Sequence, residues 1–221
     1  MATGPSESDG SSLRAREVSR LLRNRYPDTT PLLRFSNPFE LLIAVILSAQ
    51  TTDNQVNQVT PTLFSRYPTP GALASAPLEE IEAIVHSTGF FRSKAKNIRR
   101  TAAILAEKHG GEIPEAMEDL VSLPGVGRKT AHVVRGVVFG LPAIIVDTHF
   151  RRVVSRIGLS RGGTPEKVER DVELLVPGEE RFAFSMAANN HGRQVCFSRK
   201  PECGRCPVRQ LCDYASYMFP E

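Results

Sequence analysis

The chain has 221 residues, of which 41% are hydrophobic, and its formal net charge is +4 at pH 7. This composition supplies enough apolar material for a core and excludes a chain that is disordered throughout. No apolar run approaches the roughly 20 residues of a transmembrane helix, and the Ser- and Gly-rich residues 1–12 lack the apolar segment of a secretory signal. We therefore expect a disordered tail over residues 1–12, a cytoplasmic location and a mild preference for anionic partners.

Helix signals recur along the chain and strand signals are nearly absent, so we expect an all-α fold of about ten helices. The first expected helix covers residues 13–26, and residues 27–31 form a linker. The apolar run 144–146 has the composition of a short strand, but we interpret it as a buried extended link. Further helices are expected over 53–67, 78–89, 114–121, 128–139, 150–158, 164–175 and 179–195.

A strong helix start precedes the most apolar segment of the chain. Asn37 is a favourable N-cap, Pro38 suits the first helical position, and Glu40 completes a pattern like a capping box. Residues 41–50 are apolar on every helical face until the segment turns polar, which predicts a helix buried on all sides. Asp53 is expected to cap the helix that follows.

A basic amphipathic helix is expected from Ser93, which we assign as its N-cap, to the glycines at 110–111. Apolar side chains at helical spacing form its inner face. The basic side chains, which we place on the outer face, are those of Lys94, Lys96, Arg99 and Arg100.

A glycine-rich turn follows, between a short expected helix (118–123) and a longer one (128–139), within an element of about residues 117–136. The glycines of Pro124-Gly125-Val126-Gly127 allow positive φ angles and a close approach of the backbone to a ligand. The next helix starts with free N–H groups and a dipole that favours an anion, so a DNA phosphate fits there with Arg128 as support. An ordinary connection punctuated by glycines explains the same four residues.

Two charged residues, Lys129 and Asp147, lie eighteen positions apart after this turn. Lys129 lies in the first turn of a helix, where the dipole and Arg128 disfavour the ammonium form, and a neutral lysine can form a Schiff base with a sugar carbon. Asp147 precedes another helix and offers an anion to a cationic, oxocarbenium-like transition state. The alternatives are a phosphate-contacting or surface lysine and a plain helix N-cap.

Four cysteines lie at the spacing Cys196-x6-Cys203-x2-Cys206-x5-Cys212. In a reducing compartment such a cluster indicates metal rather than disulfides. Four thiolates suit a [4Fe–4S] cluster or tetrahedral zinc, and the spacing leaves both open. Basic residues that surround the cysteines form either a clamp on the DNA backbone or a solvated surface; they include Arg199 and Lys200.

Together these features resemble the endonuclease III family, the bacterial bifunctional DNA glycosylases of the helix-hairpin-helix superfamily. The resemblance covers residues 12–212. Beside the cysteine spacing it rests on four segments: LLIAVILSAQTTD (41–53), GFFRSKAKNI (89–98), LPGVGRKTA (123–131) and VDTHFRR (146–152).

The resemblance implies two all-α domains. A six-helix barrel over residues 31–141 would contain the helix-hairpin-helix element. Residues 13–30 and 142–221 would form an iron–sulfur domain, in which Cys196, Cys203, Cys206 and Cys212 hold a [4Fe–4S] cluster.

The resemblance also assigns roles to residues. Lys129 becomes the nucleophile and Asp147 its carboxylate partner. Gln50 matches the residue that fills the space left by an extruded nucleotide, and Phe90 stands where the family often has an intercalating leucine. His149 would support the site. The predicted DNA-backbone contacts are Gly125, Val126, Gly127, Arg128, Arg199 and Lys200.

The expected activity is that of a base-excision-repair glycosylase that removes oxidised or saturated pyrimidines from duplex DNA. Associated AP lyase activity would cut abasic strands by β-elimination through a Schiff base on Lys129. The protein would act as a monomer at the bacterial nucleoid. Two alternatives remain: an adenine-specific mismatch glycosylase, which usually lacks a lysine at position 129 and has a further C-terminal domain, and a non-catalytic helix-hairpin-helix DNA-binding module.

Overall fold

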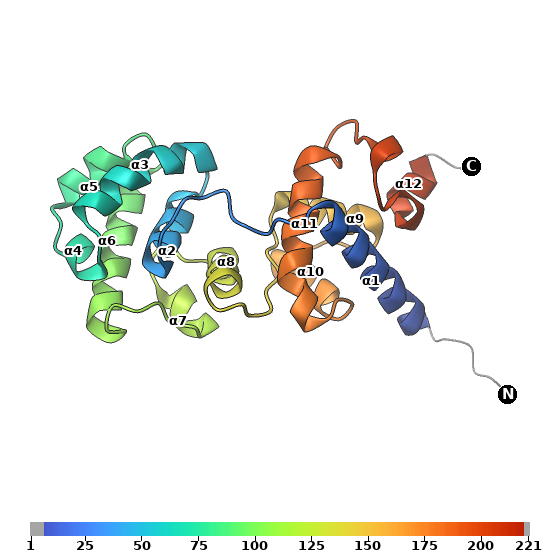
Figure 1. The fold of residues 1–221 in the computed structure, drawn as a ribbon, viewed down its shortest axis with the longest axis horizontal. Helices are drawn as coiled ribbons and strands as arrows, with labels where there is room; N and C mark the ends of the chain where they lie inside the picture. Colours follow the sequence, from blue (N-terminus) through green and yellow to red (C-terminus); the bar gives the residue numbers. More distant parts are fainter. Residues whose placement is uncertain (1–6, 219–221) are drawn as a thin grey trace. The chain divides into compact units, whose positions relative to one another are not determined.

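The computed structural model describes residues 7–218 and is helical, with no strand in that range (Figure 1). The predicted all-α class is therefore confirmed. The run 144–146 is an extended link, as expected, and both Ile144 and Ile145 are buried. The described part of the chain contains no helix that is long and apolar enough to cross a membrane.

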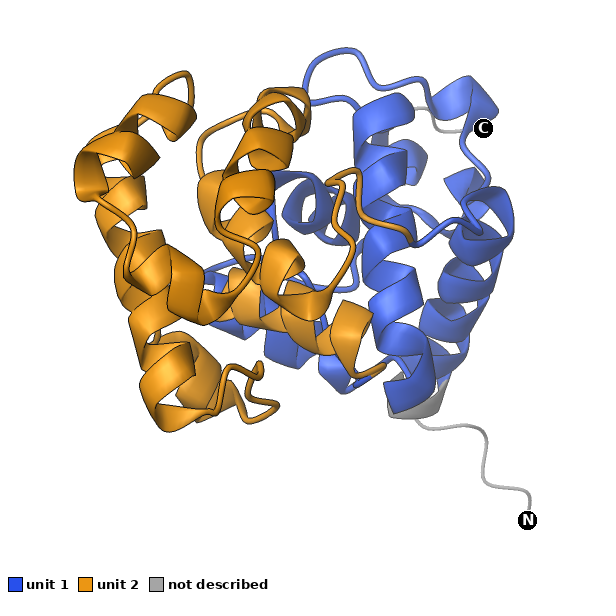
Figure 2. Ribbon diagram, turned by 60° about the vertical axis from the view of Figure 1, so that its left-hand side comes forward, with its two compact units in different colours: residues 1–29, 141–221 blue, residues 30–140 orange. Residues whose placement is uncertain are grey.

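The chain folds into two compact units, which Figure 2 colours separately. Unit 1 combines Met1–Thr29 with Leu141–Glu221, and unit 2 is Thr30–Gly140. Each unit has a hydrophobic core of its own. The chain therefore enters unit 2 once and leaves it once, and both ends of the chain belong to unit 1.

Unit 2 is built on α2 (Pro38–Leu47), whose apolar residues 41–47 are all buried. The predicted capping is present: Asn37 Oδ1 accepts a hydrogen bond from the Glu40 backbone at 2.9 Å, and the Glu40 carboxylate accepts one from the Ser36 backbone at 2.6 Å. The other helices of the unit are α3 (Asp53–Arg66), α4 (Pro70–Ala74), α5 (Leu78–Val85), α6 (Phe91–Lys108), α7 (Met117–Ser122) and α8 (Arg128–Val138).

The structure corrects three local predictions in unit 2. Thr52, and not Asp53, caps α3, because its hydroxyl accepts a hydrogen bond from the Gln55 backbone. Helix α6 is not capped by Ser93: it begins at Phe91, after Phe90 in the left-handed conformation. Lys94, which we placed on the outer face of this helix, is buried.

Unit 1 contains α1 (Glu7–Arg25), α9 (Thr148–Ile157), α10 (Pro165–Glu173), α11 (Arg181–Gln194) and α12 (Asp213–Met218), with short 3-10 turns at Gly178–Glu180, Cys203–Arg205 and Arg209–Leu211. Helix α11 packs against both α1 and α9. At the second contact the rings of Phe150 and Phe184 meet edge to face, with their centroids 5.9 Å apart. These contacts fix the start of α9, where Asp147 lies.

The N-terminal helix is longer than expected. Residues 7–12, which we assigned to a disordered tail, belong to α1; residues 1–6 lie outside the described part. Polar contacts tie this helix to distant parts of unit 1: Ser19 donates to Glu180 at 2.7 Å, and Arg14 pairs with Asp213 at 2.9 Å. Such partners are remote in sequence, so the local pattern did not reveal them.

Candidate functional site

Gly125 fixes the turn between α7 and α8. Its φ is +81°, which a residue with a side chain rarely adopts, and a Cβ at this position would lie 3.0 Å from Asn97 Nδ2 and 3.1 Å from Ile46 Cγ2. The Thr101 hydroxyl anchors the same turn by donating a hydrogen bond to the Pro124 carbonyl at 2.9 Å. The turn is therefore held against α2 and α6.

The other glycine of the turn has a different role from the one we predicted. Gly127 has φ −96°, which residues with a side chain also adopt. A Cβ at this position would meet nothing within 4 Å, so the space beside it is open. It is the N-cap of α8 and offers no side chain to its N–H groups. An open, uncapped helix start is the arrangement that accepts an anion.

Val126, by contrast, faces inward. Its side chain is 6% exposed and belongs to the core of unit 2, and its backbone N–H donates to the Leu123 carbonyl at 3.0 Å. These contacts engage the side chain and the backbone N–H of Val126 within unit 2, and its contact with DNA stays a prediction. The apolar side chain of Val126 packs in the core of unit 2 and so holds the turn against it.

Lys129 is the second residue of α8, and its side chain is exposed, as is that of Arg128 before it. Lys129 lies two positions after Gly127, in the first turn of α8.

Asp147 is the N-cap of α9 and has a hydrogen-bond partner for each carboxylate oxygen. Oδ1 accepts from the Phe150 backbone at 2.8 Å, and Oδ2 accepts from the side-chain amide of Asn189 on α11. Arg193 supports that amide by donating to its oxygen at 2.9 Å. The carboxylate is thus held in one orientation by two helices, a feature that the sequence did not predict beyond the cap.

Two arginines of α9 hold the segment that leads to the cysteines. Arg152 donates to the Cys196 carbonyl at 2.9 Å and lies 3.2 Å from His149 Nδ1. Arg156 donates to the Phe197 carbonyl at 2.6 Å and to the Cys196 sulfur at 3.3 Å. The four-residue spacing of the two arginines, which puts them on one helix face, was the available signal for this role.

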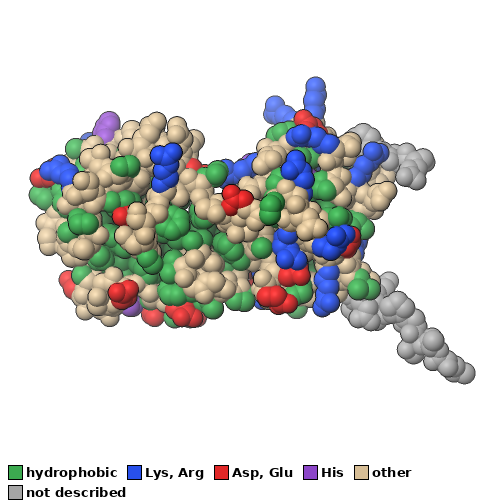
Figure 3. Space-filling model, viewed as in Figure 1, with side chains coloured by type: hydrophobic (Ala, Val, Ile, Leu, Met, Phe, Trp, Pro, Cys, Tyr) green, Lys and Arg blue, Asp and Glu red, His purple; other side chains and the backbone are tan. Residues whose placement is uncertain are grey.

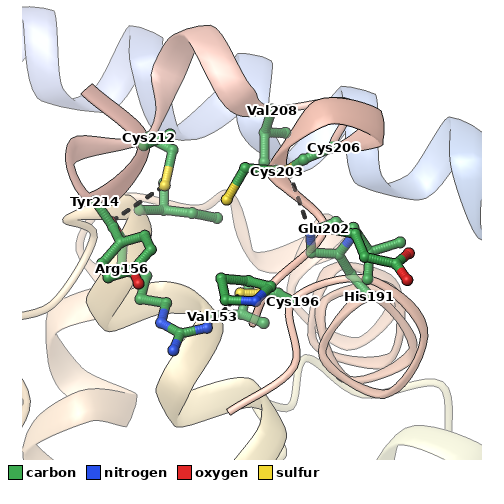
Figure 4. Close-up of a pocket in the computed structure, with 14 residues that line it drawn as sticks. Val153, Arg156, His191, Cys196, Glu202, Cys203, Cys206, Val208, Cys212 and Tyr214 are labelled. Carbon is green, nitrogen blue, oxygen red and sulfur yellow. Dashed lines mark hydrogen bonds between the residues drawn. The ribbon is translucent and has the colours of Figure 1, made fainter. Parts of the chain in front are cut away.

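All four cysteines line one small pocket of unit 1 (Figure 4). The sulfur atoms of Cys203 and Cys212 point into it from one side and that of Cys196 from the other. Cys206 lies 3.4 Å from His191 Nε2. The rest of the wall is largely apolar and includes Val153, Ile157, Val195, Pro201, Val208 and Ala215.

The chemistry of this pocket fits an iron–sulfur cluster. All four cysteines are free thiols. Together they surround the space of one pocket. A four-iron cluster needs such a space, whereas tetrahedral zinc draws its thiolates to about 2.3 Å from one point. Burial raises the pKa of the Cys206 thiol to about 11. Burial and the charges of Arg25 and Arg205 lower the pKa of the His191 imidazole to about 4.

The remaining predicted DNA contacts lie on exposed segments. Gln50 (φ +54°) ends the turn after α2, and Phe90 (φ +58°) precedes α6 with 69% of its side chain exposed. Arg199 and Lys200 are exposed in the loop after α11. Figure 3 shows Lys and Arg side chains gathered over the part of unit 1 where α11 ends.

Known proteins match the chain over both units. Residues 43–177 match the HhH-GPD superfamily of base excision DNA repair proteins, and residues 196–212 match the iron–sulfur binding domain of endonuclease III. The endonuclease III of Synechocystis is 48% identical over 203 residues, which cover 91% of this chain and 93% of that protein. The chain belongs to the endonuclease III family.

Solved structures agree with that assignment. A trapped covalent intermediate of an endonuclease III with DNA superposes with a TM-score of 0.87 at 40% identity, over 99% of both chains. The endonuclease III of Escherichia coli K12 is 44% identical over 90% of this chain and 94% of that protein.

The chain is accordingly a base-excision-repair DNA glycosylase with AP lyase activity that binds duplex DNA. Its C-terminal region is the family's [4Fe–4S] binding domain.

Proposed function

We propose that this enzyme removes oxidised or saturated pyrimidines from duplex DNA and then cuts the strand through a Schiff base on Lys129. The observation that carries the proposal is the placement of Lys129: an exposed amine in the first turn of α8, beside the open N–H groups at Gly127. A phosphate bound at Gly127 would bring the sugar of a neighbouring nucleotide to the lysine.

In the proposed reaction the neutral Nζ of Lys129 forms a bond to C1′ as the bond from C1′ to the base breaks. The base leaves with that electron pair and takes up a proton. Opening of the sugar ring at O4′ gives an imine between Nζ and C1′. Loss of a proton from C2′ then expels the 3′ phosphate, which cuts the strand.

Asp147 is the proposed carboxylate partner. Its two hydrogen bonds, from the Phe150 backbone and the Asn189 amide, fix its direction. A fixed anion stabilises the positive charge that develops on the sugar as the base departs, and it helps to draw the proton from Lys129, directly or through water. His149 supports this helix start from the same turn of α9.

The proposed DNA contacts divide into inserting and clamping groups. Gln50 fills the space left by the extruded nucleotide, and the Phe90 ring stacks between bases beside it. Gly125 and Gly127 shape the phosphate site, with Arg128 beside it. Arg199 and Lys200 bind the backbone through charge alone. Damaged pyrimidines that have lost aromatic stacking are the easier ones to extrude, which favours them as substrates.

We further propose that unit 2 is the helix-barrel domain and unit 1 the cluster domain. Cys196, Cys203, Cys206 and Cys212 are the proposed ligands of the [4Fe–4S] cluster, which when bound would cross-link residues 196–212 to one another within the loop after α11. The enzyme would work as a monomer on the DNA of the bacterial cytoplasm, at damaged pyrimidines and abasic sites.

A strand-cleavage assay tests this function. Duplex DNA with one thymine glycol is incubated with the enzyme, and product ends are compared with those from undamaged duplex. We expect cleavage at the lesion with a 3′ unsaturated aldehyde end, absent in Lys129→Gln. Cleavage of undamaged duplex at the same rate, or full activity of Lys129→Gln, would contradict the proposal.

A further inference from the structure

Lys94 is buried where its neighbours along α6 are exposed. Only 5% of the residue is accessible, although the flanking basic residues Lys96 and Arg100 are on the surface. Burial lowers the pKa of its ammonium group, because the charged form loses hydration. Burying a charged lysine is unfavourable unless the ammonium group gains a hydrogen-bond partner. The residue that accepts its hydrogen bond is therefore important.

The partner is Thr51, forty-three positions earlier in the chain. Lys94 Nζ donates a hydrogen bond to Thr51 Oγ1 at 2.6 Å. Thr51 directly follows Gln50, the residue proposed to fill the space of the extruded nucleotide. Its own backbone N–H donates to the Ser48 carbonyl at 3.1 Å, which closes the turn that carries Gln50. The ammonium group therefore anchors that turn from α6.

The same lysine is also bonded to the other proposed inserting residue. Its backbone N–H donates to the Phe90 carbonyl at 3.1 Å, in the first turn of α6. Phe90 and Gln50 both have left-handed backbone conformations, which are unfavourable for a residue with a side chain. Both are exposed. The surrounding contacts must hold these conformations: the Lys94 side chain holds the turn that carries Gln50, and its backbone N–H closes the first helical turn after Phe90.

The two segments also lie close together. A Cβ at Gly89 would lie 3.6 Å from the Gln50 carbonyl oxygen and 4.0 Å from Thr51 Oγ1. One step further along, Gln55 Nε2 donates to Ser87 Oγ at 2.6 Å. The turn after α2 and the loop before α6 thus lie side by side, and the buried Lys94 links α6 to the turn through its hydrogen bond to Thr51.

We propose that Lys94 is a positioning residue that holds Gln50 and Phe90 as one rigid inserting unit. The inference rests on the proposed function, because it assumes that these two side chains enter the duplex. We place Lys94 outside the chemical step, because it acts through Thr51 on the turn that carries Gln50. Its loss would therefore slow extrusion of a nucleotide from duplex DNA and leave the Schiff-base chemistry intact.

Two substrates separate these steps. A duplex with one thymine glycol requires the nucleotide to be extruded and its space filled, whereas a single-stranded oligonucleotide with one abasic site requires neither. In single-turnover assays we expect Lys94→Met to lose about tenfold in rate on the duplex, the loss typical of one hydrogen bond to a charged group. Cleavage of the single strand should stay within about twofold of the wild type.

Thr51 supplies matched variants that leave the buried lysine in place. Thr51→Val removes the hydroxyl at almost constant shape and should reproduce the duplex-specific loss. Thr51→Ser keeps the hydroxyl and should restore the wild-type ratio of the two rates. Thr51→Val also removes the longer hydrogen bond from Thr51 Oγ1 to the Ala49 carbonyl at 3.4 Å. The double variant Lys94→Met/Thr51→Val should therefore lose no more than Thr51→Val alone.

Equal losses of Lys94→Met on both substrates would show a general structural role and overturn the inference, as would an unchanged duplex rate for Thr51→Val. A wild-type enzyme that cuts neither substrate would instead refute the proposed function itself. The two failures are therefore distinguishable in one set of assays.

Discussion

The side-chain amide of Asn189 donates a hydrogen bond to Oδ2 of Asp147 and joins the middle of α11 to the start of α9. The other carboxylate oxygen is occupied by the Phe150 backbone. An N-cap alone would fix one oxygen and leave the other to solvent. With both engaged, the carboxylate is oriented before any substrate arrives, which is how a fixed charge contributes most to catalysis.

Removing this amide should therefore weaken catalysis. We expect Asn189→Ala to lower the single-turnover rate of thymine glycol excision about tenfold, as for one hydrogen bond to a charged group. Asn189→Asp should lose more, because it places a second negative charge beside Asp147. Asn190→Ala, one position along the same helix, is the matched control. An Asn189→Ala rate equal to that of Asn190→Ala would show that the amide has no part in orienting Asp147.

The two glycines of the hairpin turn should respond in opposite ways to a methyl group. Gly125→Ala should destabilise the fold by about 2 kcal/mol, since φ is +81° and the added Cβ meets Asn97 and Ile46. Gly127→Ala should change the free energy of unfolding by less than about 1 kcal/mol. It should nevertheless weaken binding to duplex DNA about tenfold, because its Cβ enters the proposed phosphate site.

Denaturant titrations and binding assays on the two glycine variants measure both effects. If Gly127→Ala binds DNA as tightly as the wild type, the phosphate is not bound at this helix start.

Stability should also depend on pH through Lys94. Its pKa is lowered by burial, so the folded state holds this proton less tightly than the unfolded state does. Burial of the charged lysine therefore lowers the free energy of unfolding. This loss is fully present below the lowered pKa, and it disappears as the pH rises towards the ordinary lysine pKa of about 10.4. Between these limits the unfolding free energy of the wild type should rise with pH relative to that of Lys94→Met.

Urea unfolding of both proteins across the alkaline range measures this difference. A constant difference over the whole range would mean that Lys94 ionises in the folded protein as it does in water.

The cysteine pocket makes a prediction about metal content. The purified wild type should contain iron at about four atoms per chain and absorb visible light. Cys203→Ser should lose most of that iron and absorbance, and the loop after α11 should become more sensitive to proteolysis because it is no longer cross-linked. Elemental analysis and limited proteolysis measure these changes. One zinc atom per wild-type chain would contradict the cluster.

Parts of the fold follow directly from short sequence patterns. Asn37, Pro38 and Glu40 predicted a capped helix start, and the apolar run behind them predicted a helix buried on all sides; both are confirmed. Such features depend on neighbours within one or two turns, so a local pattern contains them. The hairpin turn was found for the same reason, although only Gly125 of its two glycines has a positive φ.

The sequence could not reveal features that depend on distant partners. Lys94 fits a basic outer face by spacing, and it is buried because a hydroxyl forty-three residues away accepts its hydrogen bond. Asn189 lies in α11 without any pattern that links it to Asp147, forty-two positions before. The Ser- and Gly-rich residues 7–12 looked disordered, yet they extend α1. Tertiary contacts decide these cases, and propensity does not.

The most direct test of the central claim is to trap the covalent intermediate and map its attachment. The enzyme is mixed with duplex DNA that contains one abasic site, borohydride is added to reduce any imine, and the adduct is digested for mass spectrometry. We predict one modified residue, Lys129, and no adduct in Lys129→Gln. Attachment to another lysine, or an adduct that persists in Lys129→Gln, would contradict it.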